Sequence, residues 1–299
     1  MYGDSVETKI NELAGVEARY EAAVREAASE DWDIIVVIGW GFAQYLETVA
    51  PTAPDKRFVI IDSSLPYDDY DLSNCIAVTF KANEGSYLAG AVAASISTTG
   101  HIGAIGGQET PMIQDFMIGY VEGALEVNPD IKVSISWVGN YADSARGKEL
   151  ALAQMNNGVD VCFQIAGGAG LGVIEAAVEM DRYAIGVDSD QAMLFDESDP
   201  DKAAAIPTSM IKDVGGAIFE IVTMDMEGTV AWGSPLSLGV RESTTGVAKN
   251  KYYEQMVPKA VQDVVDAMEA KIRSGDTVVT TAYGMTPDAI DEIFNAVKP

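Results

Sequence analysis

Short apolar runs alternate with longer amphipathic stretches along most of the chain. Strands are predicted where the apolar runs are nearly continuous, at 6–10, 33–39, 57–62, 75–80, 101–107, 132–139, 160–167 and 183–188. Helices are predicted where apolar residues recur with helical spacing, at 16–29, 42–50, 84–98, 112–127, 144–157 and 170–181. Apolar strands separated by helices are typical of parallel sheets covered on both faces. The pattern therefore predicts an α/β protein.

The last third of the chain departs from this alternation. A helix is expected over 211–227, and the segment 233–248 is rich in turn residues and strand-like. A long helix is predicted to begin at Pro258 and to stop at Gly275, because proline is favoured in a first turn and glycine just past a helix end. A last helix is expected from about Pro287.

Length and composition set broad limits. The chain has 299 residues, of which 48% are apolar, so about two domains are expected. No run of about eighteen apolar residues occurs, and the start, MYGDSVETKINEL, has neither a basic region nor an apolar stretch. We therefore expect no spanning helix or signal peptide within this chain, and any export signal to lie outside it.

The chain is strongly acidic. It carries 46 Asp and Glu against 19 Lys and Arg, which gives a net charge of −27. Such a field repels phosphate backbones and anionic lipid, so nucleic acid is not an expected partner. A highly soluble surface in a salty or extracellular setting is the simplest explanation.

The sequence offers few groups for metal binding or covalent chemistry. Cys75 and Cys162 lie in apolar runs and are expected to be buried core residues, and His101 is the only histidine. The glycine-rich AGGAGLG (166–172) is neither a P-loop nor a clean dinucleotide fingerprint, and no G-x-S-x-G occurs. We expect no metal, no cofactor and no catalytic residue. Binding without chemistry is favoured over an enzyme.

Residues just after the strands are the candidate ligand contacts, because ligands of open α/β sheets bind beyond the carboxyl ends of the strands. These candidates are Trp40, Phe42, Asp62, Gly107, Gly168 and Asp188. Other interpretations stay open. An aspartate after a strand often caps a helix, which applies to Asp62 and Asp190, and Phe42 could belong to the core.

Several longer stretches together resemble one family. They are FKANEGSYLAGAVAA (80–94), GHIGAIGG (100–107), FMIGYVEGALEVNPDIKV (116–133), GKELALAQMNNGVDVCFQIAGGAGLGVIEAA (147–177), AIGVDSDQ (184–191) and TSMIKDV (208–214). These stretches resemble the basic membrane protein family, the purine-nucleoside-receptor-like substrate-binding proteins of ABC importers.

The resemblance implies a periplasmic-binding-protein fold of type I, with two doubly wound parallel-sheet lobes joined by a three-segment hinge. The N-terminal lobe would comprise 1–81 plus 210–232, and the C-terminal lobe 82–209 plus 233–299. The hinge segments would lie near 81–83, 209–212 and 233–239.

The resemblance also assigns roles to residues. Asp188 would accept hydrogen bonds from ribose hydroxyls, Lys212 would lie beside it and donate to the sugar, and Asp62 would accept from the base edge. Apart from the resemblance, Trp40 and Phe42 are candidate aromatic platforms for a base, with Trp40 the better exposed of the two. Gly107 and Gly168 are candidates because glycine-rich turns at strand ends expose backbone N–H groups to a ligand.

One departure from the family pattern concerns the N-terminus. The family opens with a strand and a D-x-S-F-N loop that stacks on the base, whereas residues 6–10 here match the second strand. Three explanations are open: the chain is a fragment, the segment 6–10 pairs directly with 33–39, or a neighbouring chain fills the gap in a homo-oligomer. Without the loop, weak nucleoside binding is expected.

The expected function is a solute-binding protein that captures a nucleoside, with a purine favoured, between two lobes and delivers it to the membrane permease of an ABC importer. The expected location is extracytoplasmic, as a cell-surface lipoprotein or in the periplasm. The alternative is a cytoplasmic ligand-sensing or regulatory module of the same fold.

Overall fold

The computed structural model describes residues 6–13 and 16–299, which form two compact units. The smaller unit comprises the chain up to Thr79 together with Ile218–Ser237, and the larger unit comprises Phe80–Ala217 and Leu238–Pro299. The chain therefore passes between the units three times. No helix among the described residues has the length and apolar character needed to span a membrane.

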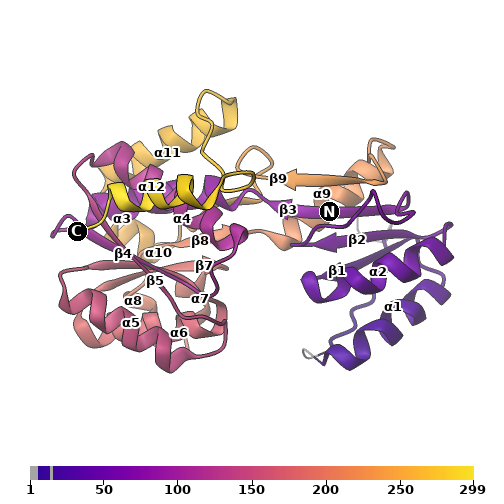
Figure 1. Cartoon of the computed structure of the whole chain (residues 1–299), viewed down its shortest axis with the longest axis horizontal. Helices are drawn as coiled ribbons and strands as arrows, with labels where there is room; N and C mark the ends of the chain where they lie inside the picture. Colours follow the sequence, from indigo (N-terminus) through magenta and orange to yellow (C-terminus); the bar gives the residue numbers. More distant parts are fainter. Residues whose placement is uncertain (1–5, 14–15) are drawn as a thin grey trace. The chain divides into compact units, whose positions relative to one another are not determined.

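The smaller unit is built on a sheet with the strand order β1-β2-β3-β9, in which β1, β2 and β3 are parallel (Figure 1). Val24, Leu46, Phe58 and Ile60 are among the residues that form its core. The strands are β1 (Ile34–Ile38), β2 (Arg57–Ile61), β3 (Cys75–Phe80) and β9 (Ser234–Leu238). The helices of this part are α1 (Tyr20–Ser29), α2 (Ala43–Val49) and the portion of α9 (Val214–Met226) from Ile218 onward, with short 3-10 turns at Glu17–Arg19, Trp40–Phe42 and Ala50–Thr52.

The prediction of a strand at residues 6–10 is wrong. The segment forms no strand, the side chain of Ile10 is 86% exposed, and Lys9 pairs with Glu30 at 2.7 Å. An alternating pattern gives a strand only when a neighbouring strand accepts its hydrogen bonds and covers its apolar face. The segment therefore does not pair with β1, which is the edge strand of its sheet.

The larger unit contains a sheet with the order β10-β8-β7-β6-β4-β5. All pairs of neighbouring strands in this sheet are parallel except β10 and β8, which are antiparallel. The strands are β4 (His101–Gly106), β5 (Lys132–Trp137), β6 (Val161–Ile165), β7 (Tyr183–Asp188), β8 (Ser209–Lys212) and β10 (Thr245–Val247). All predicted strands other than 6–10 are present.

Strand β8 differs from expectation. A helix was expected from residue 211, but helix α9 begins at Val214, and Ser209–Lys212 pair with β7 on one side and β10 on the other. These hydrogen bonds attach Ser209–Lys212 to the sheet of the larger unit, and that compact unit extends to Ala217.

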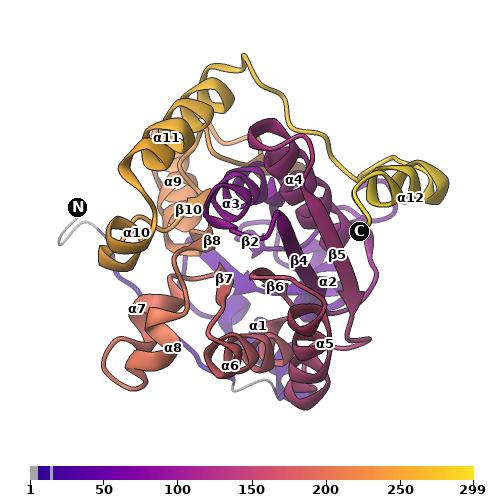
Figure 2. The same ribbon diagram turned by 90° about the vertical axis from the view of Figure 1, so that its left-hand side faces the viewer.

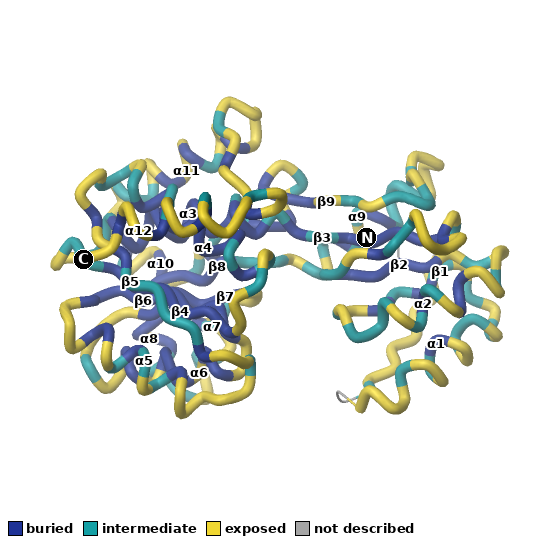
Figure 3. Tube along the Cα trace, viewed as in Figure 1, coloured by how far each residue is buried: buried dark blue, intermediate teal, exposed yellow. Residues whose placement is uncertain are grey.

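Helices cover both faces of the larger sheet (Figure 2). Helices α3 (Ala82–Ile96) and α4 (Pro111–Val127) pack on one face, and α5 (Ser144–Asn156) and α6 (Gly170–Met180) on the other. The approach of α3 to α4 requires small residues, because a Cβ on Gly90 would lie 2.0 Å from the Tyr120 carbonyl oxygen. Strands β4 and β6 are buried, whereas the edge strand β5 is largely half-exposed (Figure 3).

The remaining helices are α7 (Gln191–Phe195), α8 (Pro200–Ala204), α10 (Lys251–Met256), α11 (Lys259–Ser274) and α12 (Pro287–Ala296). Pro258 precedes α11 and Gly275 ends it with φ 86°, so both predicted boundaries are confirmed. The cysteines are buried as predicted, and burial raises the pKa of each thiol to about 12.

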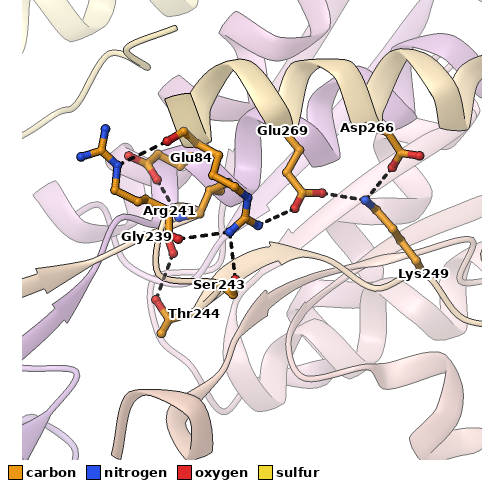
Figure 4. A network of polar contacts seen from close by, with 10 residues as sticks. Glu84, Gly239, Arg241, Ser243, Thr244, Lys249, Asp266 and Glu269 are labelled. Carbon is orange, nitrogen blue, oxygen red and sulfur yellow. Dashed lines mark hydrogen bonds and ion pairs between the residues drawn. The ribbon is translucent and has the colours of Figure 1, made fainter. Parts of the chain in front are cut away.

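A polar network fixes the segment 239–244 between α3 and α11 (Figure 4). The Glu84 carboxylate accepts a hydrogen bond from the Val240 N–H at 2.8 Å. The Arg273 guanidinium donates to the Ser243 hydroxyl and to Glu269, which also pairs with Lys249. The segment that returns the chain to the larger unit is thereby held from both sides.

Candidate ligand-binding site

Asp188 and Lys212 end adjacent strands at the carboxyl edge of the larger sheet. Asp188 is the last residue of β7 and lies opposite Ile211 of β8, so Lys212 follows directly beside it. The Lys212 Nζ is 3.2 Å from the Asp188 Oδ1. The structure brings this sequence-predicted pair together.

The two side chains differ sharply in exposure. Only 9% of the Lys212 side chain is exposed, against 52% for Asp188. The Lys212 ammonium lies 5.5 Å from the ring centre of Phe116 and 5.9 Å from that of Phe80, within the range of cation–π attraction. The lysine is therefore held within the protein, while the carboxylate presents a solvent-facing side.

Both predicted ligand aspartates have unusual backbone conformations. Asp188 has φ 65° and Asp62 has φ 62°, in the left-handed region that residues other than glycine seldom adopt. Such conformations cost about 1–3 kcal/mol and concentrate at binding and active sites. In each unit, the unusual residue lies at the carboxyl end of a buried strand.

A buried polar network supports the strand ends behind Asp188. The Gln191 Oε1 accepts hydrogen bonds from the Val187 N–H at 3.0 Å and from the Gln164 Nε2 at 2.6 Å. The Gln191 N–H donates to the Ser209 hydroxyl. The network joins β6, β7 and β8, and the sequence analysis missed it; its only sequence signal is the glutamine inside the apolar strand CFQIAGG.

Gly107 and Gly168 lie beside Tyr141, a residue that the sequence analysis also missed. A Cβ on Gly107 would lie 2.3 Å from two ring carbons of Tyr141, and a Cβ on Gly168 would lie 3.2 Å from the Tyr141 carbonyl oxygen. Tyr141 is in the loop between β5 and α5. Glycine at 107 therefore makes room for this ring.

In the smaller unit, Asp62 follows β2, and its N–H donates to the Val78 carbonyl at 2.8 Å. No helix begins after Asp62, so the capping interpretation does not apply to it. Capping does apply to Asp190, whose side chain accepts from the Met193 N–H at the start of α7.

Trp40 and Phe42 lie in the short turn after β1 and differ in environment. Trp40 is 76% exposed, whereas the Phe42 ring stacks on Tyr20 with centres 4.1 Å apart and packs against the core of the smaller unit. A hollow of about 150 Å³ lies between them, lined by Glu17, Tyr20, Ile38, Gly39, Trp40, Gly41 and Phe42.

The strand ends of each unit carry groups suited to binding. Those of the larger unit present a carboxylate acceptor and a lysine donor, which recognise hydroxyls, and those of the smaller unit present a carboxylate acceptor and aromatic rings, which recognise planar heterocycles. Within residues 6–13 and 16–299, no group of three or more His, Cys, Asp and Glu side chains is arranged to hold a metal ion.

Solved structures share this fold. An ABC transporter solute-binding protein from Aeropyrum pernix K1 superposes with a TM-score of 0.75 at 24% identity, covering 95% of this chain and 86% of that one. A transcriptional activator of the comK gene from Bacillus halodurans gives 0.76 at 24% identity, covering 89% and 87%. The α/β fold of the type I periplasmic-binding-protein class, predicted from the sequence, is thus confirmed.

Sequence relatives define the family. Basic membrane protein A of Borreliella burgdorferi is 33% identical over 83% of this chain and 70% of its own length. The ABC transporter nucleoside-binding protein BmpA of Lactococcus lactis is 32% identical over 83% of this chain and 73% of its own length. The profile of the Bmp family, described as "ABC transporter substrate-binding protein PnrA-like", matches residues 2–277. The chain belongs to this family of ABC transporter substrate-binding proteins, which bind their substrates rather than transform them.

Proposed function

We propose that this protein captures a nucleoside, preferably a purine nucleoside, and delivers it to the membrane permease of an ABC importer. The observation that carries the proposal is the ion pair of Asp188 and Lys212 at the carboxyl edge of the larger sheet. The L. lactis relative, whose printed name is nucleoside-binding protein, supports the choice of ligand.

The pair suits the ribose. A carboxylate only accepts hydrogen bonds and can take two O–H donors at once, so Asp188 matches the vicinal hydroxyls. Bonds to a charged acceptor are shorter and stronger than neutral ones. Lys212 holds the carboxylate from its buried side and donates to a sugar oxygen.

In this proposal, the remaining predicted residues contact or surround the base of the nucleoside. Asp62 accepts from a ring or exocyclic N–H, and a base without that donor leaves the carboxylate unpaired, which gives selectivity. Exposed Trp40 is the better stacking candidate of its turn, with Phe42 as its support. Gly168 lets the ligand approach the backbone of the larger unit, and Gly107 makes room for the Tyr141 ring beside it.

The proposed working place is outside the cytoplasm, at the cell surface or in the periplasm, where such proteins serve a permease. The alternative is a cytoplasmic ligand-sensing module, and the fold shared with a transcriptional activator is compatible with it. Transport is favoured because the family itself is one of ABC transporter substrate-binding proteins.

Ligand titration tests the proposal. Purine nucleosides, pyrimidine nucleosides, free bases and ribose are added to millimolar concentration while the thermal midpoint is followed, because a ligand of the folded state raises the midpoint by mass action. Nucleosides should stabilise the wild-type protein, with purine nucleosides most effective. Isothermal titration calorimetry then gives Kd.

Variants locate the site. Asp188→Ala and Lys212→Met should abolish the nucleoside response. Lys148→Met is the matched control, because Lys148 pairs with Glu179 at 2.9 Å between α5 and α6 and should not affect binding. A wild-type protein that responds to no nucleoside would overturn the proposed function, and an unchanged response of Asp188→Ala would overturn the site.

A further inference from the structure

Asp188 lies at the centre of a tight backbone turn. The Ser189 N–H donates to the Val187 carbonyl at 2.8 Å, across Asp188 with its φ of 65°. A hydrogen bond between residues two apart, closed around a positive φ, defines the rare and strained form of γ-turn. The turn sets the direction in which the carboxylate leaves the strand, and its strain has to be offset by contacts around it.

Gln191 fixes the residue that begins this turn. Pairing between β6 and β7 ends at Phe163 and Ile185. Alternate residues of a strand face the same neighbour, so the Val187 N–H is the next one directed toward β6, and it donates to the Gln191 Oε1 at 3.0 Å. Val187 is only 6% exposed, which makes an N–H without an acceptor costly at this position. The Gln191 side chain therefore takes the place of a strand neighbour.

Buried partners orient the Gln191 side chain in turn. The fully buried Gln164 donates from its Nε2 to the same oxygen at 2.6 Å, and the Gln191 N–H donates to the Ser209 hydroxyl at 3.2 Å. The space is closely filled, because a Cβ on Gly186 would lie 2.2 Å from the Ser209 Oγ and 2.8 Å from the Gln191 Oε1. The position of the Gln191 oxygen is thus fixed from β6, β7 and β8.

Two different constraints act on Asp188. Lys212 contacts the tip of its side chain at 3.2 Å, whereas Gln191 holds the backbone turn from which that side chain starts. A carboxylate accepts from two neighbouring hydroxyls only when both of its oxygens are directed toward them. Because the turn governs this direction, the contact with Gln191 governs how well the carboxylate distinguishes a diol from a single hydroxyl.

We infer that Gln191 is a positioning residue that gives the site its preference for a ribonucleoside over the corresponding deoxynucleoside. The inference rests on the proposed function and deepens it by naming the class of sugar and the residue that enforces the choice. Gln191 acts through Asp188 rather than on the ligand directly. A site built to bond a hydroxyl rejects an analogue that lacks it, provided that the bonding group is held in place.

The test uses variants of matched size. Gln191→Met keeps the length of the side chain without its acceptor, and Gln191→Glu keeps an acceptor oxygen. Gln154→Met is the matched control, because buried Gln154 bonds to the Ser136 hydroxyl of β5 at 3.0 Å, and β5 lies three positions from β7 in the sheet. Adenosine and deoxyadenosine are titrated into each protein by calorimetry, and urea unfolding without ligand verifies that each variant is folded.

The wild type should prefer adenosine by about tenfold or more, the difference expected for one hydrogen bond to a charged acceptor. Gln191→Met should reduce this preference to about twofold, mainly by weakening adenosine binding, whereas Gln191→Glu and Gln154→Met should keep it. A merely structural role would weaken the binding of both ligands equally and leave the preference unchanged. Should Gln191→Met be unfolded, Gln164→Met replaces it, because it removes the donor that orients the Gln191 oxygen and should lower the preference in the same direction.

The outcomes separate the inference from the proposed function. A folded Gln191→Met with the preference of the wild type, or a folded Gln191→Glu without that preference, overturns the inference and leaves the proposed function standing. A wild type that binds both ligands equally does the same. A wild type that binds no nucleoside overturns both.

Discussion

Lys212 contacts the carboxylate of Asp188 from within the protein, at 3.2 Å, while Asp188 remains half exposed. The Lys212 side chain is only 9% exposed, and the cost of removing its ammonium from water offsets much of the attraction within the pair, so the pair is weak evidence for a role in stability. The pair orients a carboxylate whose backbone is itself in a costly conformation. The proposed binding role of Asp188 can therefore be tested separately from its effect on folding.

Asp188→Gly should separate these two roles. Glycine adopts φ 65° without the strain that a Cβ causes, so the free energy of unfolding without ligand should be unchanged or rise by up to ~1 kcal/mol. The nucleoside response should nevertheless be lost with the carboxylate. Urea unfolding and calorimetry measure the two effects.

Asp181→Gly is the control for this variant, since Asp181 ends α6 with φ 53° in the same left-handed region. It should gain similar stability and keep full binding. A strong destabilisation by Asp188→Gly, or retained binding, would contradict the interpretation.

Asp160 should make stability depend on acid pH. Burial alone would raise the pKa of Asp160, but the hydrogen bonds from Ser97, Thr98 and Thr99 outweigh it and lower the pKa below the ordinary 3.8. A lowered folded-state pKa gives stability that is fully present above the unfolded-state pKa and is lost as the pH falls through the folded-state value.

Asp160→Asn should therefore cost about 2 kcal/mol at pH 7, because bonds to a charged acceptor are replaced by weaker ones. The difference in the free energy of unfolding between Asp160→Asn and the wild type should become smaller near pH 3. Urea unfolding at both pH values measures it, and a difference independent of pH would refute the assignment.

Asp115 anchors the segment after α11 to the start of α3. Its carboxylate accepts hydrogen bonds from the Ala282 N–H at 2.9 Å, the Asn83 N–H at 3.3 Å and the Thr281 hydroxyl. Asp115→Ala should lower the free energy of unfolding by about 3 kcal/mol, since two buried N–H groups lose their acceptor. Thr281→Val, which removes only one hydroxyl, should cost about 1 kcal/mol. Equal effects of both variants in denaturant titrations would argue against the anchor.

The free edge of β1 should promote self-association. The Arg57 N–H donates to the Asp33 carbonyl and the Gly39 N–H to the Ile61 carbonyl, so the backbone groups of Ile34, Val36 and Ile38 face away from β2. Within the described residues no strand pairs with this edge, and β1 has none of the charges or prolines that usually protect edges.

Sedimentation velocity at rising protein concentration should therefore show that copies of this chain associate with one another. Such association corresponds to the homo-oligomer that the sequence left open. Val36→Lys should favour the monomer, whereas Val264→Lys on the exposed surface of α11 should not. A wild type that stays monomeric throughout the concentration series would exclude this association.

The sequence located candidate site residues best where a local motif marks a strand end. The apolar run AIGV followed by an acid places Asp188 at a strand end, and the family resemblance adds Lys212. Nothing local marks Tyr141, Gln164 or Gln191. Tyr141 meets Gly107 and Gly167 only because β5 lies beside β4 and β4 beside β6 in the folded sheet.

By itself, the sequence determined the α/β class, the periodic helices, the ends of α11 and the burial of both cysteines, because each depends on residues close together in the chain or on a hydrophobic run. Tertiary structure decided which short segments became strands. Residues 209–212 form β8 because β7 and β10 supply hydrogen-bond partners on both sides, whereas residues 6–10, with a comparable pattern, find none. Strand formation requires a neighbour, and neighbours are set by the whole fold rather than by local sequence.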